Sequence, residues 1–180
     1  MLTQSLTTPR LLLRPLVAGD AAHFARLLGP DPAAIQQMAQ MPDPCTEAAA
    51  RSWIEARLGP GACVFAILRR SDRAFLGVAG YGGQAEMPET GYWLGADYRG
   101  QGYTTEAIKA LIDFARRSGV PRLHADTFPN NPASARVLAK AGFTPVGVVL
   151  RDFPARGGVR QLTRHIYDFT AARQAPARRV

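Results

Sequence analysis

The chain has 180 residues, of which 47% are hydrophobic and 20% charged, a composition typical of one globular domain rather than of a disordered or fibrous chain. Its 22 lysines and arginines outnumber the 14 acidic residues and give a formal net charge of +8, which attracts anions in general without identifying one. Two cysteines are too few for a disulfide scaffold, and no apolar run is long enough for a membrane span or a signal peptide, so we expect a cytoplasmic protein without membrane contact.

The first third of the chain predicts a strand followed by short helices. Residues 10–17, RLLLRPLV, are typical of a strand, and Asp20 then offers an N-cap to a helix that ends at Gly29. The segment 30–60 is rich in proline and alanine and predicts one or two short helices, the clearer of them at 46–58.

The middle of the chain predicts three strands and then the strongest helix. CVFAILRR at 63–70 and AFLGVAGYG at 74–82 flank the polar turn SDR, as the two arms of an antiparallel hairpin do. TGYWLG at 90–95 is a further short strand. Apolar residues then recur on one helical face over 103–118, and Gly119 ends this pattern.

The last part of the chain alternates strand, helix and two strands. RLHADTF at 122–128 predicts a strand, and a helix follows at 132–141 with Asn131 placed as its N-cap. Two final strands near 143–150 and 161–169 are joined by the turn PARGG.

Together these elements predict an α/β (α+β) fold with a mixed, mostly antiparallel central sheet of about seven strands flanked by helices. One domain is expected over residues 1–170, and the last residues, 171–180, are expected to form a basic, flexible tail. The cysteines and histidines lack the spacing of a metal site, so no metal is expected. Binding of nucleic acid through the basic surface is the weakest hypothesis, because no stacking or groove-reading motif is present.

The stretch YWLGADYRGQGYTTEA, residues 92–107, places two glycines directly before the strongest helix. Glycine leaves room for a close ligand, and the start of the helix directs unpaired N–H groups and its positive dipole toward the loop. Arg99 adds a charge, and Thr104 and Thr105 add hydroxyl donors, so the loop suits a pyrophosphate. A P-loop and a dinucleotide fingerprint fit less well, since there is no Gly-Lys-Ser/Thr ending and Thr105 stands where a third glycine is needed. A plain structural turn is the alternative.

GYWLGADYRGQGYTTEAIKALIDFA followed by NNPASARVLAKAGF resembles the GNAT superfamily of acyl-CoA-dependent acetyltransferases, in particular the ribosomal-protein N-terminal acetyltransferases. The acyl-CoA signature of that family, Arg/Gln-x-x-Gly-x-Gly/Ala, falls on Arg99, Gly102 and Thr104, where threonine is a mild departure. The likeness covers residues 11–169 and implies a single-domain GNAT fold that uses acetyl-CoA as co-substrate. The residues that it places against the cofactor are Trp93, Leu94, Arg99, Gly100, Gln101, Gly102, Tyr103, Thr104, Thr105 and Asn131.

The resemblance also directs the search for catalytic groups. A carboxylate just before the strand GYWLG would serve as general base, and Glu89 is the best placed, with Glu86 in reserve. The family often has a tyrosine as general acid four residues before the Gly-Phe pair, but this chain has Leu138 there. Ser134, one turn into the same helix, is the substitute, either as a proton donor or as a contact to sulfur. For Glu89 the alternative is a solvated turn residue, and for Ser134 it is local bonding to the backbone.

The leading hypothesis is therefore an N-acetyltransferase that transfers an acetyl group to a primary amine by direct attack in a ternary complex. The acceptor is either a protein N-terminus or a small-molecule amine, and a second copy of the chain, as a homodimer, is a further candidate partner. The alternative from another class is a non-catalytic acyl-CoA-binding module with the same fold, which the missing tyrosine supports.

Overall fold

The structure, a computed structural model, describes residues 4–38, 41–59 and 63–170. The strands are β1 (Leu6–Thr7), β2 (Leu11–Pro15), β3 (Cys63–Arg69), β4 (Phe75–Gly82), β5 (Glu89–Leu94), β6 (Arg122–Thr127), β7 (Thr144–Phe153) and β8 (Gly158–Asp168). The α-helices are α1 (Ala21–Leu28), α2 (Pro32–Gln36), α3 (Glu47–Glu55), α4 (Tyr103–Arg117) and α5 (Pro132–Ala141). Three short 3₁₀ turns are η1 (Ala18–Asp20), η2 (Ala96–Tyr98) and η3 (Pro154–Arg156). The expected tail at 171–180 lies outside the described residues.

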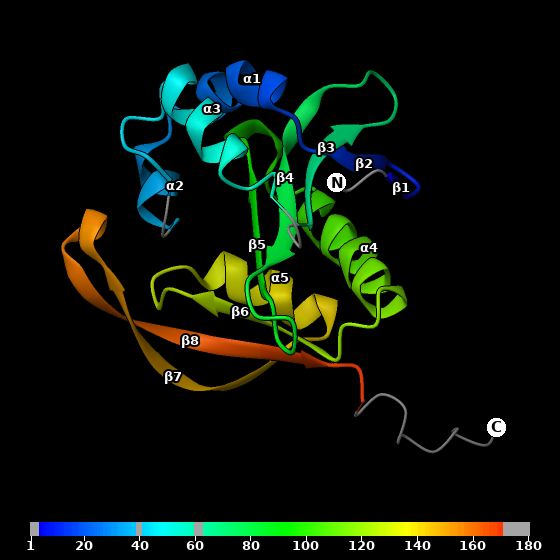
Figure 1. Cartoon of the computed structure of the whole chain (residues 1–180), viewed down its shortest axis with the longest axis vertical. Helices are drawn as coiled ribbons and strands as arrows, with labels where there is room; N and C mark the ends of the chain where they lie inside the picture. Colours follow the sequence, from blue (N-terminus) through cyan, green and yellow to red (C-terminus); the bar gives the residue numbers. More distant parts are fainter. Residues whose placement is uncertain (1–3, 39–40, 60–62, 171–180) are drawn as a thin grey trace.

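The eight strands form one sheet in the order β1-β2-β3-β4-β5-β6-β8-β7 (Figure 1). Every pair of neighbours is antiparallel except β5 and β6, which run parallel. The predicted mixed, mostly antiparallel sheet is thus confirmed. The strand beyond the expected seven is β1, which has only two residues and therefore carries no recognisable alternation in the sequence.

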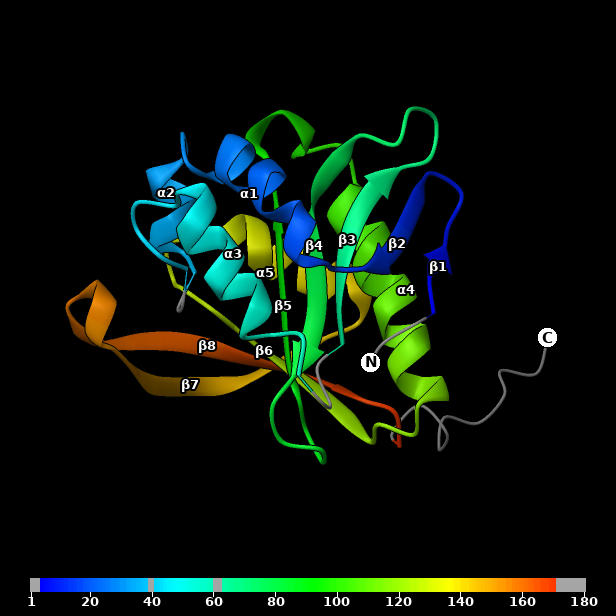
Figure 2. The same ribbon diagram turned by 45° about the horizontal axis from the view of Figure 1, so that its top comes forward.

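Helices cover both faces of the sheet, with α1, α2 and α3 on one face and α4 and α5 on the other (Figure 2). Two hydrophobic clusters fill the two sides. Phe24 of α1 and Ile54 of α3 belong to one cluster, and Ile108 of α4 and Leu138 of α5 belong to the other. Strand β5 contributes to both clusters, because successive side chains of a strand point to opposite faces of the sheet.

The two helices beside the predicted site begin and end where local signals place them. Gly102 has φ +81° directly before α4, and α4 ends at the residue before Ser118. The side chain of Asn131 accepts a hydrogen bond from the Ser134 N–H at 3.1 Å, and Gly142 closes α5 with φ +99°. Each of these glycines occupies a left-handed backbone conformation that side chains disfavour.

The predicted cap of α1 is wrong. The Asp20 carboxylate makes no capping hydrogen bond to α1. It is buried and instead accepts two hydrogen bonds from the Arg14 guanidinium, at 2.8 and 2.6 Å, and one from the Val17 N–H at 3.0 Å. A charged hydrogen bond to arginine is stronger than a neutral backbone cap, so the buried carboxylate binds Arg14.

The β7–β8 hairpin is longer than the sequence predicts and extends beside α2 (Figure 1). The buried guanidinium of Arg156 in η3 donates to the carbonyl of Ile35 at 3.3 Å and also to that of Met41. These bonds fasten the hairpin turn to the α2 segment. Within the described ranges, no helix is both long and apolar enough to cross a membrane.

Candidate active site

Strands β5 and β6 are paired at a single position. Glu89 lies opposite His124, and the His124 N–H donates to the Pro88 carbonyl at 3.1 Å. Past that point the two strands diverge (Figure 1), while the ladder of β5 to β4 continues to Leu94 on its other side. Alternate residues of β5 face away from β4, and past the contact with His124 these are Tyr92 and Leu94. Because strand N–H and C=O groups require partners, the backbone of Tyr92 and the N–H of Leu94 can accept an extended ligand as an added strand.

The glycine loop lies just beyond the far end of β5. Gly100 and Gly102 have φ +74° and +81°. A side chain added at Gly100 would meet nothing within 4 Å, and one added at Gly102 would meet only Arg10 Nη2, at 3.4 Å. The loop therefore combines left-handed backbone with open space, and α4 begins there with amides that have no preceding helical turn to bind. These features fit a diphosphate.

Arg99 lies near this loop but is already engaged. Its Nε donates to the Leu94 carbonyl at 3.0 Å, and its Nη2 lies 2.5 Å from Asp31 Oδ2. The Asp31 side chain in turn caps α2 by accepting from the Ala34 N–H at 3.0 Å. The guanidinium thus joins the end of β5 to the start of α2.

Arg10 is the cation that approaches Gly102, and no sequence pattern pointed to it. Its Nη1 donates to the Gln101 carbonyl at 3.0 Å, and its carbon Cζ lies 4.6 Å from the centre of the Tyr103 ring. Its Nε forms an ion pair of 2.7 Å with Glu106 in the first turn of α4. Residues 10 and 106 are far apart in the chain, so only the fold brings this charge to the loop.

Glu106 is fixed by three hydrogen bonds in addition to its place in α4. Thr8 Oγ1 donates to it at 2.6 Å, and the backbone N–H and Nε of Arg10 donate at 2.9 and 2.7 Å. Burial acts to raise the pKa of Glu106, but these bonds outweigh burial and leave the pKa below its ordinary value. The carboxylate therefore holds Arg10 in place.

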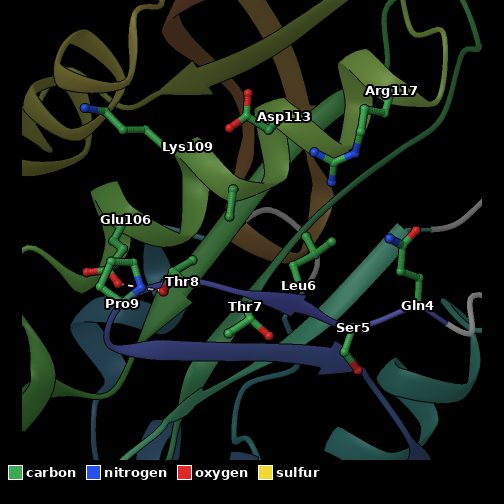
Figure 3. A pocket seen from close by; sticks show the side chains of 11 residues that line it. Gln4, Ser5, Leu6, Thr7, Thr8, Pro9, Glu106, Lys109, Asp113 and Arg117 are labelled. Carbon is green, nitrogen blue, oxygen red and sulfur yellow. Dashed lines mark hydrogen bonds between the residues drawn. The ribbon is translucent and has the colours of Figure 1, made fainter.

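A pocket of about 460 Å³ adjoins Glu106 on the side of β1 (Figure 3). Residues 4–9 form one wall, and Lys109, Asp113 and Arg117 of α4 form the other. None of the residues predicted from the sequence to bind the cofactor or to act in catalysis lines this pocket. The pocket therefore touches the candidate site at Glu106, which holds Arg10, and otherwise lies beside it.

Glu89 lies at the start of β5 within a network of charges. Arg151 Nη1 on β7 lies 2.5 Å from Glu89 Oε1 and 3.3 Å from Asp126 Oδ2. Arg164 on β8 also binds Asp126, through two hydrogen bonds of 2.9 and 2.8 Å. Hydrogen bonding to Glu89 raises the pKa of Arg151. The proposed base is therefore an ion-paired residue of the sheet, and the reserve candidate, Glu86, is exposed in the β4–β5 loop.

Glu89, His124 and Asp126 each place one donor atom within 4.8 Å of the others, as groups that bind a metal do. In this chain Arg151 and Arg164 already bind the two carboxylates, which makes the group a poor site for a further cation. His124 Nδ1 lies 3.0 Å from the Met87 carbonyl, so its proton is on Nδ1 and its Nε2 is an acceptor when the ring is neutral.

Ser134, in the first turn of α5, reaches across to β5. Its Oγ lies 2.8 Å from the hydroxyl oxygen of Tyr92, which stands in the stretch GYWLG but to which the family resemblance assigns no role. Burial raises the pKa of Tyr92 to about 12. Leu138 is fully buried in the core, so the second turn of α5 offers no hydroxyl to the site. Ser134 is the one hydroxyl that α5 carries.

The side chains of three further residues predicted to bind the cofactor, Trp93, Leu94 and Gln101, have structural contacts within the protein. The Trp93 side chain is buried against Phe24, with ring centres 5.5 Å apart. Its backbone N–H and C=O face β4, because the Gly95 N–H, two residues further along the same ladder, donates to the Leu76 carbonyl. The Leu94 side chain is buried in the opposite cluster. Gln101 donates from its side chain to the Asp97 carbonyl at 2.9 Å and so stabilises the turn before α4.

The fold brings the predicted residues to two ends of one strand. The glycine loop lies beyond the end of β5, whereas Glu89 stands at the beginning of this strand, whose six residues span about 17 Å. Asn131 caps α5 and Ser134 lies in its first turn, and α5 shares a face of the sheet with α4. An extended ligand along the free edge of β5 would therefore pass from the glycine loop toward Glu89.

A family model described as the acetyltransferase (GNAT) domain matches residues 10–144, three quarters of the chain. A curated protein of Bacillus subtilis (strain 168), "Probable N-acetyltransferase YjcK", is 31% identical over 98 residues, which make up 52% of this chain and 54% of that protein. The chain thus spans about half the length of this curated relative.

Solved structures have the same fold over nearly the whole chain. RimJ from Mycobacterium smegmatis, in complex with CoA-disulfide, has a TM-score of 0.80 and 23% identity, over 95% of this chain and 88% of that one. An acetyl transferase from Salmonella typhimurium that modifies the N-terminal serine of 50S ribosomal subunit protein L7/L12 has a TM-score of 0.81 and 19% identity, over 92% and 99%. Likeness at such low identity is a likeness of fold.

Proposed function

This chain belongs to the GNAT acetyltransferase family, and we propose that it transfers an acetyl group from acetyl-CoA to a primary amine by direct attack in a ternary complex. The observation that carries the proposal is the free edge of β5, which begins beside the left-handed glycine loop and leads to Glu89. The presence of CoA-disulfide in the related RimJ structure supports the choice of cofactor.

The diphosphate is proposed to bind the first amides of α4, where Gly100 and Gly102 leave the backbone accessible. Tyr103, Thr104 and Thr105 supply these amides, and the two threonines add hydroxyl donors. Arg10 is proposed to supply the positive charge, because it already donates to the Gln101 carbonyl in the same loop. In this arrangement Arg99 shapes the loop through Leu94 and Asp31 and contributes to binding indirectly.

The pantetheine arm is proposed to add to β5 along residues 91–94, with Asn131 at its side. The N–H of Leu94 would then hold the arm near the glycine loop, and the N–H of Tyr92, nearer Glu89, would polarise the thioester carbonyl as charge develops on its oxygen. Most of the rate enhancement would come from orientation, because the protein forms no covalent bond to the acetyl group.

Glu89 is proposed as the general base that removes a proton from the acceptor ammonium, directly or through one water. The free amine then attacks the thioester carbon, and the carbon–sulfur bond breaks with its electron pair on sulfur. The nitrogen that has attacked gives its second proton to water, which leaves a neutral amide. Ser134 is proposed to face that sulfur and to donate a hydrogen bond to it. The ion pair with Arg151 keeps Glu89 at the start of β5, near His124.

The acceptor is proposed to be a protein N-terminus, with a small-molecule amine as the alternative. The relative from Salmonella typhimurium, whose substrate is the N-terminal serine of a ribosomal protein, supports the first choice. Thiol release from acetyl-CoA should be measured with a panel of peptides that differ in their first residue and with a panel of small amines. Turnover confined to peptides with a free α-amine supports an N-terminal acetyltransferase.

The competing function is a non-catalytic acyl-CoA-binding module. It is favoured if calorimetry detects acetyl-CoA binding but no acceptor in either panel releases thiol. A protein that does not bind acetyl-CoA contradicts both functions.

A homodimer is also part of the proposal. β7 is an edge strand of ten residues, and Val146, Val148 and Leu150 on it are 56%, 59% and 72% exposed. Unpaired edges with exposed apolar side chains are typical of surfaces that pair with another chain. A second copy that pairs antiparallel through its own β7 would bind the unpaired backbone groups of the edge and bury the exposed apolar side chains in one symmetric contact.

A further inference from the structure

The contact between Tyr92 and Ser134 joins the two elements that would enclose the sulfur of the cofactor. Tyr92 stands on β5, whose free edge is the proposed pantetheine site, and Ser134 stands in the first turn of α5. The Tyr92 hydroxyl oxygen lies 2.8 Å from Ser134 Oγ and 3.2 Å from the Ser134 carbonyl oxygen. The Ser134 N–H is bound to Asn131, so the serine is fixed on its backbone side as well.

The two hydroxyls together carry two protons, which allows two arrangements. In one, Tyr92 donates to the Ser134 carbonyl and Ser134 donates to the Tyr92 oxygen. In the other, Tyr92 donates to Ser134 Oγ, and the serine proton points to a third acceptor. An acceptor atom beside Ser134 selects the second arrangement.

The chemical state of Tyr92 favours its role as the fixed donor. Burial raises its pKa to about 12, so the phenol keeps its proton at the pH values at which acetyl transfer is measured. A bound serine hydroxyl that accepts from a phenol is also a better donor, because hydrogen bonds in a chain polarise one another. Without Tyr92, the Ser134 hydroxyl would be free to rotate back to its own helix.

We propose that Tyr92 is a positioning residue that directs the Ser134 hydroxyl proton at the sulfur of the cofactor. This inference rests on the proposed function and adds to it the residue that makes Ser134 a donor. When the carbon–sulfur bond breaks, the electron pair stays on sulfur as a thiolate, and Ser134 stabilises it through a hydrogen bond. Neither hydroxyl loses its proton, and water protonates the thiolate after release.

The test measures the acidity of the thiol of CoA bound to the protein. Thiolate formation is followed by ultraviolet absorbance against pH, with the complex of S-methyl-CoA as the blank. The variants are Tyr92→Phe, Ser134→Ala and the double variant. The matched control is Tyr81→Phe, which removes a buried tyrosine hydroxyl from the same core on the neighbouring strand β4.

The thiol of bound CoA should be more acidic than the thiol of free CoA. Tyr92→Phe should make the bound thiol less acidic, lowering its acid dissociation constant about three- to tenfold, which is the effect of one hydrogen bond. Ser134→Ala should lower the acid dissociation constant of the bound thiol at least as far. The double variant should have the same constant as Ser134→Ala, because Tyr92 acts through Ser134. Tyr81→Phe should match the wild type. In turnover, Tyr92→Phe should lower kcat while leaving the KM for acetyl-CoA unchanged.

Three results would overturn the inference. An unchanged thiol acidity in Tyr92→Phe would remove the role of Tyr92 while leaving the proposed function intact. Additive effects in the double variant would show that Tyr92 does not act through Ser134. A wild-type protein that does not bind CoA would contradict the proposed function itself, and the inference with it. Thermal unfolding of each variant checks that the fold is retained.

Discussion

Arg151 Nη1 lies 2.5 Å from Glu89 Oε1, so the carboxylate proposed as general base forms an ion pair with an arginine of β7. This pair crosses from β7 at the edge of the sheet to β5 at its centre, and the same guanidinium reaches Asp126 at 3.3 Å. A substrate ammonium that approaches Glu89 therefore meets a carboxylate that is already oriented, with its second oxygen available.

Glu89→Gln should lower kcat about 100-fold, because general base catalysis contributes at least that factor. Glutamine keeps the shape of the side chain but accepts no proton from the ammonium. Calorimetry should give an unchanged affinity for acetyl-CoA. The control is Glu86→Gln in the exposed β4–β5 loop, and full activity of Glu89→Gln would place the base elsewhere.

Gly102→Val should abolish acetyl-CoA binding, because a branched side chain would cover the first amides of α4 and would also be strained at φ +81°. The strain alone lowers the free energy of unfolding by about 1 to 2 kcal/mol. Gly119→Val separates the two effects, since Gly119 follows the other end of α4 with φ +77° and open space around it. Calorimetry should detect normal acetyl-CoA binding in Gly119→Val. Loss of binding in both variants would mean that backbone strain, rather than blocked amides, explains the effect of Gly102→Val.

Arg10→Met should weaken the binding of CoA about tenfold, the effect of losing one charge-assisted hydrogen bond. The affinity for pantetheine, which has no phosphate groups, should not change. A matched control is Arg70→Met, because Arg70 binds the neighbouring carbonyls of Thr8 and Pro9 and no residue of the glycine loop. Equal losses of affinity for CoA and for pantetheine would mean that Arg10 acts on the fold of the loop rather than on phosphate.

Arg164→Met should lower the free energy of unfolding by about 3 kcal/mol at pH 7, because it removes the main partner of a buried carboxylate. Burial acts to raise the pKa of Asp126, but bonds from Arg164 outweigh it and hold the pKa below its ordinary value. A depressed pKa stabilises the folded state above the ordinary pKa of the carboxyl group, and this contribution is lost as the pH falls through the folded-state value.

The difference between Arg164→Met and the wild type should therefore be largest at neutral pH and should shrink in acid. Urea denaturation at pH 7 and at a pH well below the ordinary carboxyl pKa measures the difference in free energy of unfolding under both conditions. Arg116→Met is the control, because its ion pair with Asp113 is exposed on both sides and should contribute at most about 1 kcal/mol. A loss that stays constant with pH would mean that packing, rather than charge, explains the effect.

Leu150→Lys should convert the proposed homodimer into a monomer, because a charge on each copy would face an apolar surface across the β7 edge. Sedimentation velocity at several concentrations measures the change. Val17→Lys is the control, since Val17 is an exposed apolar residue remote from β7 in the sheet order, between β2 and α1. A wild-type protein that sediments as a monomer at all concentrations contradicts the dimer.

Sequence patterns predicted the parts of the fold that depend on near neighbours in the chain. Gly102, Asn131 and Gly142 mark the ends of α4 and α5, because caps and left-handed turns act within four residues of a helix end. The family motif located the glycine loop because the motif, too, consists of near neighbours in the chain. Contacts between residues that are distant in the sequence left no such local signal.

The pairs that complete the candidate site are separated by long stretches of chain. Arg10 meets the glycine loop 91 residues away at Gln101, and Arg151 meets Glu89 across 62 residues. Tyr92 stands in a strand where an aromatic residue is usual for packing, so its contact to Ser134 was not distinguishable from ordinary core. The cap assigned to Asp20 failed because Arg14, a stronger partner, lies on the strand before it.

The bonds that Arg99 makes have a mechanical consequence. One guanidinium links the last carbonyl of β5 to the capping carboxylate of α2, and α2 is itself fastened to the β7–β8 turn by Arg156. A displacement of the hairpin would thus be transmitted through α2 to the strand end beside the glycine loop. The β7–β8 hairpin and the end of β5 beside the glycine loop are therefore mechanically coupled through Arg156, α2 and Arg99.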